Sequence, residues 1–471
     1  MLDDLKTAVL RLREKSVEVS EAGDMRFSRS LDHTRYSVLP AAVVFAKSSD
    51  DVAEVLRVAN ELRVGVTVRG SGTGCAGGAV PVDGGLVLDL SGLDSIEIDP
   101  VARVATVGAG AITAAVDAAA NKYGLFYAPD PSSHKYCSIG GNIACNAGGL
   151  RAFKYGLTRD NVLSLTAFSA AGELLECGLP LRKFSAGLNL RDLFIGSEGI
   201  LGVVVQAKLK LLPLPEAFKT MAVFFDDDFA AFDGVGAIMR AGLSPCILEF
   251  MDAETIACVS KKFPELRVPS GKSALLVEFD GTEREVDASA RKCAALFADV
   301  RLAEDEHRRQ DIWKIRRAAS SSMYLLADTK INQDIVLPHS ALREFFRYYK
   351  KLGAESGLAC PVFGHSGDGN YHIHFMFAAA DADAKKRAQN AMDLSIKKAI
   401  ELGGAVSGEH GIGFLKSKYM PLQHSAAEIE YMRAIKKLFD PNNILNRDKV
   451  VVCSDLRERL SPLKNIKLPW D

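Results

Sequence analysis

The chain has 471 residues, 48% of them hydrophobic and 25% charged, and Lys+Arg 58 against Asp+Glu 59 give a net charge of −1. This length predicts about two or three domains, and the composition is typical of a soluble globular protein. A net charge near zero excludes a global basic field that recruits nucleic acid or anionic membrane, so no nucleic-acid partner is expected.

The N-terminal stretch MLDDLKTAVLRLREK mixes charged and apolar residues at helical spacing and contains no apolar core of a signal peptide or membrane span. The sequence therefore predicts a cytoplasmic protein and leaves open a peripheral association at the inner membrane face. Nine cysteines are scattered without any C-x-x-C pair. This spacing disfavours both a disulfide framework and a cysteine-held iron–sulfur cluster.

The first half of the chain alternates short helices and strands. A helix capped by Ser49, with an apolar face of Val52, Val55, Leu56 and Ala59, leads into a strand. The strand-like segments expected here are 64–68, 86–90, 95–98, 103–107 and 162–170, and the segment 196–212 completes this region. An alanine-rich helix is expected over about 112–123, and an irregular stretch comes after it, to about 156. Prolines in LLPLPEA (211–217) predict a linker.

Beyond this linker, strands alternate with helices, which predicts an α/β sandwich of one sheet backed by helices. The expected strands are 221–225, 246–250 and 274–279, and the expected later helices are 305–327, 339–356 and 383–402. A histidine-rich loop and strand (362–377) lies between the last two helices. The tail is predicted to be a helix from about Lys416, followed by FDPNNILN.

Two glycine-rich stretches are the first candidates for a binding site. Gly72, Gly74 and Gly77 match the G-x-G-x-x-G dinucleotide fingerprint, but no helix is expected to open after them, as a nicotinamide Rossmann fold requires. Such a loop can instead bind a pyrophosphate through its amide N–H groups, or form a tight turn that binds nothing. The long apolar loop 129–149, PDPSSHKYCSIGGNIACNAGG, favours a binding role, because ordered loops of this length are usually functional.

At this point the sequence resembles the FAD-binding family of vanillyl-alcohol oxidase and p-cresol methylhydroxylase (PCMH). The branch is that of the D-lactate, glycolate and D-2-hydroxyglutarate dehydrogenases. The matching segments are in the family's order along the chain: RGSGTGCAGGAV, PDPSS, SIGGNIACNAGG, KYGLTRDNV, GSEGILGV, GHSGDGNYH, GEHGIG and DPNNILN.

The resemblance implies an α+β fold with a two-subdomain PCMH-type FAD-binding domain and a ferredoxin-like α/β-sandwich substrate (cap) domain, completed by a C-terminal helical return. The implied divisions are an N-terminal helical segment (1–35), the FAD-binding domain (36–215), the FAD-linked oxidase C-terminal substrate domain (216–415) and a segment returning to the FAD domain (416–471).

The resemblance also implies FAD as the cofactor. The implied contacts are Arg69, Gly70, Ser71, Gly72, Thr73, Gly74, Gly77, Gly78, Pro129, Asp130, Ser132, Ser133, Ile139, Gly140, Gly141, Asn142, Ala144, Asn146, Gly148, Gly149, Tyr155, Gly156, Glu198, Gly199, Leu201, Gly202, Val203 and Asn446. Relatives with a covalent flavin carry a histidine where Thr73 stands, so the flavin is expected to be non-covalent.

Histidines are concentrated in one strand. Alternation of Tyr371, Ile373 and Phe375 with His372 and His374 places both histidines on one face of the strand and the aromatic side chains on the other. A histidine pair two residues apart is a start for a transition-metal site, and the alternative is a set of hydrogen-bonded core histidines.

The resemblance implies that His365, His372 and Glu409 bind a divalent metal, with zinc as the first candidate and manganese and iron as others. It also implies that His374 contacts substrate or a ligand. His410 is the predicted general base, since an imidazole with an ordinary pKa near 6.5 accepts a proton at neutral pH. Its alternative role is that of a turn histidine between glycines.

Arg316 matches the W-x-x-R arginine that holds the substrate carboxylate in relatives, and its alternative role is a solvated helix charge. Lys330 and Asn332 lie near a second carboxylate contact. The implied reaction is oxidation of a D-2-hydroxy acid, D-lactate first and glycolate or D-2-hydroxyglutarate next. The implied mechanism is hydride transfer to FAD N5 with assistance from the metal and His410.

Two alternatives remain open. One is an FAD subunit of a multi-subunit glycolate oxidase or of a complex coupled to an electron-transfer flavoprotein. The other is a non-redox transferase like alkylglycerone-phosphate synthase. A quinone, a cytochrome or an electron-transfer flavoprotein can serve as the electron acceptor, and a homodimer stays open.

Overall fold

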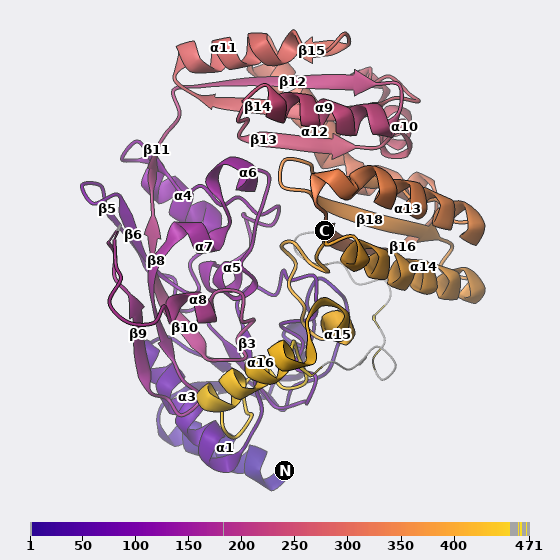
Figure 1. The fold of residues 1–471 in the computed structure, drawn as a ribbon. Coiled ribbons are helices and arrows are strands. Elements are labelled where there is room, and N and C mark those ends of the chain that lie inside the picture. Colours follow the sequence, from indigo (N-terminus) through magenta and orange to yellow (C-terminus); the bar gives the residue numbers. More distant parts are fainter. Residues whose placement is uncertain (1, 182, 453–459, 461, 464–467, 469–471) are drawn as a thin grey trace. The chain divides into compact units, whose positions relative to one another are not determined.

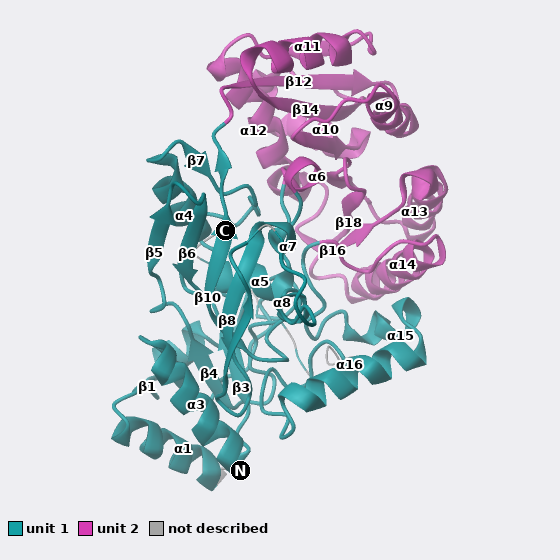
Figure 2. Ribbon diagram, turned by 60° about the vertical axis from the view of Figure 1, so that its left-hand side comes forward, with its two compact units in different colours: residues 1–149, 156–214, 409–471 teal, residues 150–155, 215–408 magenta. Residues whose placement is uncertain are grey.

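The computed structural model describes residues 2–181, 183–452, 460, 462–463 and 468. The chain divides into two compact units, shown in different colours in Figure 2. Unit 1 comprises residues 1–149, 156–214 and 409–471, and unit 2 comprises residues 150–155 and 215–408. Each unit combines helices with sheets, as the predicted α+β class requires.

The first sheet of unit 1 has the order β1-β2-β4-β3, with β2, β4 and β3 parallel and β1 antiparallel to β2. Its strand β3 and the helices α1 and α3 are labelled in Figure 1. Its strands are β1 (Glu18–Ser20), β2 (Ala42–Phe45), β3 (Val66–Arg69) and β4 (Leu86–Asp89), and the N-terminal helices are α1 (Leu2–Glu14), α2 (Gly23–Ser28) and α3 (Ser49–Leu62). The N-cap of α3 is Ser48, one residue before the predicted cap, because Ser48 forms a capping box with Asp51. The predicted apolar face of α3 is buried in the core.

The second sheet of unit 1 is antiparallel, with the order β5-β6-β10-β8-β9. Its strands are β5 (Ile96–Asp99), β6 (Val104–Gly108), β8 (Val162–Phe168), β9 (Leu174–Gly178) and β10 (Val203–Lys210). A two-stranded sheet pairs β7 (Leu125–Phe126) with β11 (Leu212–Pro213). The helices between these strands are α4 (Thr113–Asn121), α5 (Ile139–Cys145), α7 (Thr158–Asn161) and α8 (Arg191–Phe194).

The C-terminal part of the described chain returns to unit 1. It contains η4 (Ser417–Tyr419), α15 (Met420–Gln423) and α16 (Ala426–Phe439). Beyond α16 the chain runs beside β3, where Leu445 forms a parallel bridge with Val66. The Val66 N–H donates to Ile444 O at 2.7 Å, and the Asn446 N–H donates to Val66 O at 2.9 Å. The return to the FAD-binding region that the resemblance implied is therefore built as an addition to the edge of the first sheet.

Unit 2 contains one antiparallel sheet with the order β15-β12-β14-β13-β17-β18-β16. Its strands are β12 (Ala217–Phe225), β13 (Ile247–Met251), β14 (Ser273–Gly281), β15 (Val300–Leu302), β16 (Thr329–Val336), β17 (Val362–His365) and β18 (Asn370–Phe377). Its helices are α6 (Ala152–Tyr155), α9 (Asp228–Arg240), α10 (Ala253–Lys262), η1 (Pro264–Leu266), α11 (Glu283–Ala294), α12 (Glu306–Ser322), η2 (Met323–Leu325), η3 (His339–Ala341), α13 (Leu342–Ser356) and α14 (Ala382–Glu401).

The two faces of this sheet differ in chemistry. On one face the buried Tyr371 ring packs edge-on against Phe250 and Phe346, with centroids 5.9 and 5.2 Å apart, and α9 and α13 supply further rings. Residues of a strand alternate between faces, so His372 and His374 lie on the opposite face. The predicted separation of histidines from Tyr371 and its neighbours is therefore observed, and the histidine face carries the candidate site.

The limits of the compact units differ from the predicted domain limits. Unit 2 begins at Pro215, next to the predicted 215/216 limit, but ends at Gly408 instead of residue 415. Unit 2 also includes residues 150–155, although they lie within the predicted FAD-binding domain, and nothing in the sequence indicates this. Helix α6 of this segment packs against β13, and Lys154 and Tyr155 both bind Asp280 of β14.

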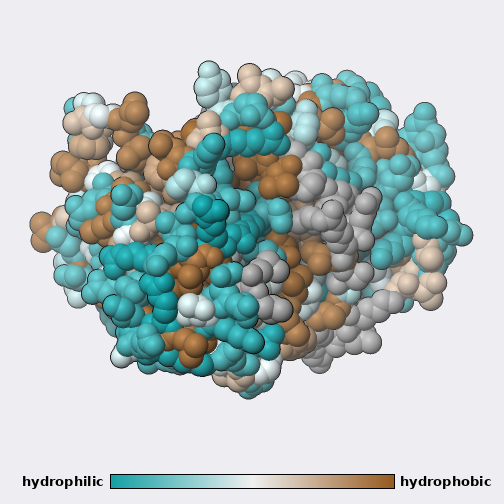
Figure 3. Space-filling view, turned by 90° about the horizontal axis from the view of Figure 1, so that it is seen from below, coloured by the Kyte–Doolittle hydropathy of each residue, from teal (hydrophilic) through white to brown (hydrophobic). Residues whose placement is uncertain are grey.

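Eight of the nine cysteines lie among the described residues and are free thiols, while Cys453 lies outside them. Within the described part of the chain, no helix has the length and apolar character needed to cross a membrane. On the face shown in Figure 3, outside the grey residues, hydrophobic side chains form small separate areas among hydrophilic ones.

Candidate active site

The histidine-rich segment forms a hairpin. Strand β17 ends at His365, which the sequence placed in the preceding loop, and β18 starts at Asn370. The turn needs glycine at Gly369, where φ is +78° and a Cβ would overlap a neighbouring backbone oxygen. The rings of His365 and His372 have centroids 5.4 Å apart and are nearly perpendicular. The hairpin therefore brings the first two candidate ligands together.

The three candidate metal ligands lie close to one another. One ring nitrogen each of His365 and His372 and one carboxylate oxygen of Glu409 lie within 4.8 Å of one another, and within the described residues this is the one such group. Glu409 directly follows Gly408, whose N–H donates to the buried Asp334 carboxylate at 2.7 Å. In the sheet Asp334 lies on β16 opposite His372 of β18. The β16–β18 pair therefore positions His372 directly and Glu409 through the bond from Gly408 to Asp334.

The donor types at this group fit a divalent metal. Two imidazole nitrogens and one carboxylate oxygen are ligands that zinc and other borderline metals take, with a position left for water or substrate. Asn370, opposite His365 in the hairpin, has a buried Oδ1 with no hydrogen-bond partner in the described structure. A buried acceptor without a donor is costly, and a bound water or other donor beside Asn370 would satisfy it.

Arg316 points from α12 to the histidine face of the sheet. Its Nε donates to the Glu249 carboxylate, and its guanidinium lies 4.5 Å from the centroid of the Phe363 ring. The side chain is 15% exposed, so the alternative of a solvated helix charge is wrong. Among the described residues, the Nη atoms of Arg316 donate no hydrogen bond. The two Nη groups of an arginine can bind one carboxylate in a bidentate manner, through two parallel N–H···O hydrogen bonds.

Glu249 is a functional candidate that sequence reasoning missed. It lies on β13 directly opposite His365, is 0% exposed, and its Oε1 is 2.5 Å from His365 Nδ1. Burial by itself would raise the pKa of Glu249, but the charges of His365 and Arg316 hold it at about 2. The carboxylate is therefore ionised and contacts a candidate metal ligand and a candidate substrate anchor at once.

A second buried carboxylate fixes the helix that carries Arg316. Glu278 on β14 accepts from Trp313 Nε1 at 2.9 Å, from Arg309 at 2.9 and 3.0 Å, and from Thr220 Oγ1 at 2.5 Å. Trp313 and Arg316 of the W-x-x-R motif thus both face the sheet. Glu278 holds α12 in place without contacting either histidine of the hairpin.

The other predicted substrate contacts lie on β16 and β18. Lys330 donates to Ser320 Oγ at 2.8 Å, and burial lowers its pKa to about 8. Asn332 is exposed and lies opposite His374. Burial holds the pKa of His374 well below its ordinary value, so this imidazole is neutral. Their roles as substrate contacts stay predictions.

His410 comes directly after Glu409 in the GEHGIG segment. Its Nε2 is 3.9 Å from Glu409 Oε1, and its side chain is 20% exposed. A partly exposed imidazole can exchange a proton with solvent after accepting one. The role of His410 as general base stays a prediction, as does its alternative role in the turn.

The first glycine-rich loop comes after β3 in unit 1. Residues 70–78 form no helix or strand, and the next element is β4, so the helix that a nicotinamide Rossmann motif requires is absent here. Arg69 is 5% exposed and donates to Leu31 O at 2.8 Å. Gly70 and Gly77 pack closely on neighbouring atoms, whereas a Cβ at Gly74 would have nothing within 4 Å. Ser71 and Thr73 are half-buried.

The contrast between Gly74 and Gly77 gives a test of the loop. Gly77 has φ +84° and a Cβ there would overlap the Phe414 ring, so Gly77→Ala should lower the free energy of unfolding by about 1–2 kcal/mol or more. Gly74→Ala should leave thermal unfolding of the FAD-free protein unchanged and weaken FAD binding about tenfold or more if the pyrophosphate lies on this loop. Unchanged FAD affinity in Gly74→Ala, measured by fluorescence titration, would argue against that position.

The second segment is partly helical. Residues Ile139–Cys145 form α5, with the Ser138 side chain accepting from Gly141 N–H at its start. Asn142 donates to Thr113 Oγ1 at 2.7 Å, and Asn146 accepts from Arg159 N–H at 2.9 Å. These two predicted FAD contacts thus also hold the local structure. Pro129, Asp130, Ser132 and Ser133 lie before this helix, and Ala144, Gly148 and Gly149 lie in its last turns and the loop after it.

Glu198 and Asn446 connect the third segment to the C-terminal return. Glu198 accepts from the N–H groups of Ile412 and Gly413 at 2.6 and 2.8 Å, and burial raises its pKa. Asn446 donates to Glu198 O at 2.5 Å and accepts from Val68 N–H at 3.0 Å. The side chains of Leu201 and Val203 are buried, and Val203 begins β10, where it pairs with Phe168 of β8.

Tyr155 is a predicted flavin contact whose hydroxyl has a protein partner, and its role at the flavin stays a prediction. It belongs to the segment taken up by unit 2, and its hydroxyl donates to Asp280 at 2.6 Å. Gly156, the next residue, belongs to unit 1 and has φ +76°. The hydroxyl of Tyr155 is therefore committed to the unit that holds the histidine hairpin.

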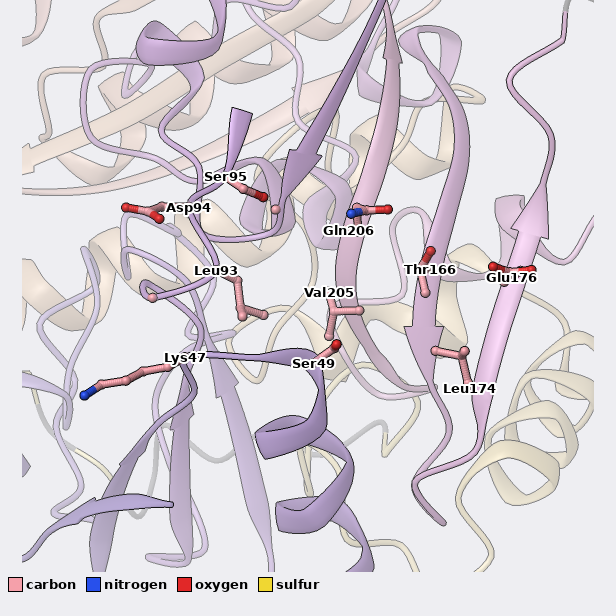
Figure 4. A pocket seen from close by; sticks show the side chains of 12 residues that line it. Lys47, Ser49, Leu93, Asp94, Ser95, Thr166, Leu174, Glu176, Val205 and Gln206 are labelled. Atoms are coloured by element: carbon pink, nitrogen blue, oxygen red, sulfur yellow. The ribbon is translucent and has the colours of Figure 1, made fainter. Parts of the chain in front are cut away.

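A cavity of about 420 Å³ lies elsewhere in unit 1 (Figure 4). Among its lining residues are Gln206, Thr166 and Glu176, which face one another across three neighbouring strands, and Lys47 and Ser49 near the start of α3. None of the predicted site residues lines it. We therefore assign no role in the reaction to this cavity.

Two family models cover most of the chain. The model described as "FAD binding domain" matches residues 40–178, and the model described as "FAD linked oxidases, C-terminal domain" matches residues 214–450. The chain belongs to the FAD-linked oxidase family. It is an FAD-dependent oxidoreductase, as the resemblance implied.

Similar curated proteins support the same family. Glycolate oxidase subunit GlcD of Bacillus subtilis is 37% identical over 466 residues, covering 97% of this chain and 98% of the relative. D-Lactate dehydrogenase of Anaerostipes hadrus is 35% identical over 427 residues, covering 87% of this chain and 89% of the relative. D-Lactate dehydrogenase of Archaeoglobus fulgidus is 35% identical over 445 residues, covering 93% and 98%.

Solved structures confirm the fold of this FAD-linked oxidase. p-Cresol methylhydroxylase matches with a TM-score of 0.77 at 16% identity, covering 97% of this chain and 98% of that one. Alkyldihydroxyacetonephosphate synthase matches with a TM-score of 0.72 at 18% identity, covering 91% and 82%. At these identities the likeness concerns the PCMH-type fold alone.

Proposed function

We propose that this FAD-linked oxidase oxidises a small D-2-hydroxy acid to the 2-oxo acid, with D-lactate as the first candidate and glycolate or D-2-hydroxyglutarate next. The observation that carries the proposal is the group of His365, His372 and Glu409, with ligand atoms within 4.8 Å of one another. Relatives named D-lactate dehydrogenase and glycolate oxidase subunit support the substrate class.

The loop 70–78, the segments 129–149 and 196–203, and Asn446 would hold FAD, non-covalently because Thr73 replaces the histidine of covalent relatives. When bound, FAD accepts a hydride from the substrate carbon at its N5 atom. The close-packed glycines with open space at Gly74 fit a ligand that approaches the backbone of this loop.

Metal binding, substrate binding and proton transfer would be carried out by different residues at the histidine-rich site. A divalent metal, zinc first, would be held by the three ligands and would lower the pKa of the substrate hydroxyl. The Nη atoms of Arg316 would bind the substrate carboxylate, with Lys330, Asn332 and His374 as further contacts. His410 would accept the hydroxyl proton on an imidazole nitrogen.

The test is anaerobic mixing of the FAD-loaded protein with D-lactate, L-lactate, glycolate and D-2-hydroxyglutarate. We expect one of the D-acids or glycolate to bleach the flavin absorption band and to yield its 2-oxo acid. If none of the four reduces the flavin, the proposal fails. Reduction followed by turnover only after a second protein is added would identify the FAD subunit of a larger complex.

A further inference from the structure

The buried carboxylate of Glu249 divides its two oxygens between two candidate functional groups. Oε1 meets His365 Nδ1 at 2.5 Å, and Oε2 accepts from Arg316 Nε. Because Nδ1 is engaged, the nitrogen that His365 presents to a metal is Nε2. Because Nε is engaged, Arg316 presents its Nη atoms to a carboxylate.

Stability alone is a weak reason for such a group. Removing ions from water is costly, and replacing a buried ion pair by apolar side chains is often neutral or stabilising. Strand β13 is otherwise apolar, with the sequence ILEFM and all five residues buried. A charge in this position is therefore expected to serve the site.

We propose that Glu249 is a positioning residue that orients the metal ligand His365 and the substrate anchor Arg316 together. A movement of this one side chain shifts both groups, so metal binding and carboxylate binding are coupled through it. The inference rests on the proposed function, because it assigns the metal and the substrate carboxylate to these two partners.

Glu278 provides a matched control. It is also a buried glutamate on a neighbouring strand of the same sheet, and it also binds an arginine of α12, Arg309. It contacts neither His365 nor Arg316. In Glu278→Gln the amide oxygen can still accept from Trp313 Nε1 and keep α12 in place, so this variant removes a buried charge at Arg309 without disturbing the two groups that Glu249 orients.

The experiment compares Glu249→Gln, Glu278→Gln and the wild type, each loaded with FAD and stripped of metal. Zinc and manganese affinities are measured by calorimetry, and kcat and KM with the best acid are measured after metal is restored. For Glu249→Gln we expect metal affinity to fall by about 10–100-fold and KM to rise. For Glu278→Gln we expect both to stay within about threefold of the wild type, with lower thermal stability.

The proposal would be overturned if Glu249→Gln had the metal affinity and the KM of the wild type. It would also be overturned if Glu278→Gln lost as much metal affinity and raised KM as much as Glu249→Gln. If Glu249→Gln does not fold, the double variant Glu249→Met, Arg316→Met replaces the pair by apolar groups, and its metal affinity must still fall beyond that of Arg316→Met alone. A wild type that reduces its flavin with none of the acids refutes the proposed function. If the wild type reduces its flavin but Glu249→Gln keeps the metal affinity and KM of the wild type, only the inference about Glu249 is refuted.

Discussion

Replacing His410 by alanine should lower turnover with the best 2-hydroxy acid by about 10²–10⁴-fold, the usual contribution of a positioned general base. The loss should appear in the rate of flavin reduction measured by stopped flow. Because His410 is 20% exposed and is no candidate metal ligand, flavin absorption, metal content and thermal stability should stay close to the wild type.

His424 offers a control for this experiment. It is a partly exposed histidine at the end of α15, 3.4 Å from Glu428, and it belongs to no predicted site. His424→Ala should reduce the flavin at the wild-type rate. Near-normal flavin reduction by His410→Ala would show that another group removes the proton, and that His410 serves the turn between its glycines.

Removal of the metal should have an effect of similar size. A Lewis acid at the substrate oxygen contributes several kcal/mol, and each 1.36 kcal/mol is tenfold in rate. Dialysis against a chelator, or His372→Ala, should therefore lower flavin reduction by about 10²-fold or more. Zinc or manganese should restore the dialysed wild type and leave His372→Ala inactive.

His374→Ala provides the comparison, because His374 shares the strand face of His372 but is not in the group of candidate ligands. It should retain bound metal, measured by elemental analysis, and raise KM if it contacts substrate. A chelated wild type with full activity would contradict the role of the metal in the reaction.

Local sequence signals were sufficient to predict the parts of the site that lie within one segment. The alternation from Tyr371 to Phe375 indicates which side chains share a face, because strand geometry alone sets that pattern. The glycine-rich loop 70–78 was distinguished from a Rossmann motif because a strand, and no helix, was expected after it. The resemblance supplied His365, His372 and Glu409 as a set, and these residues lie together.

Glu249 and Asp334 could not be placed by such signals. Glu249 meets His365 because β13 pairs with β17, and a single sequence does not reveal strand partners more than a hundred residues apart. One signal was available: a lone charge within the apolar run ILEFM is rare unless it is paired. The same holds for Glu278 in LLVEF, and both charges bind arginines of α12.

The assignment of residues 150–155 to unit 2 could not be predicted either, because nothing in the motif KYGLTRDNV indicates a boundary between Tyr155 and Gly156. Its cause lies in tertiary contacts, where Lys154 and Tyr155 bind the Asp280 carboxylate on β14 of unit 2. Neighbouring residues of this one motif, Tyr155 and Gly156, therefore belong to different compact units.

The pairing of residues 444–446 with β3 bears on the order in which the chain is completed during synthesis. Unit 2 needs only residues up to Gly408, whereas the edge of the first sheet stays open until Leu445 has been made and lies beside Val66. An open edge strand is a template for unwanted pairing with other chains. The nascent protein therefore carries the edge strand β3 uncovered through most of translation, and loss of the segment that contains residues 444–446 would be expected to promote aggregation before it affects catalysis.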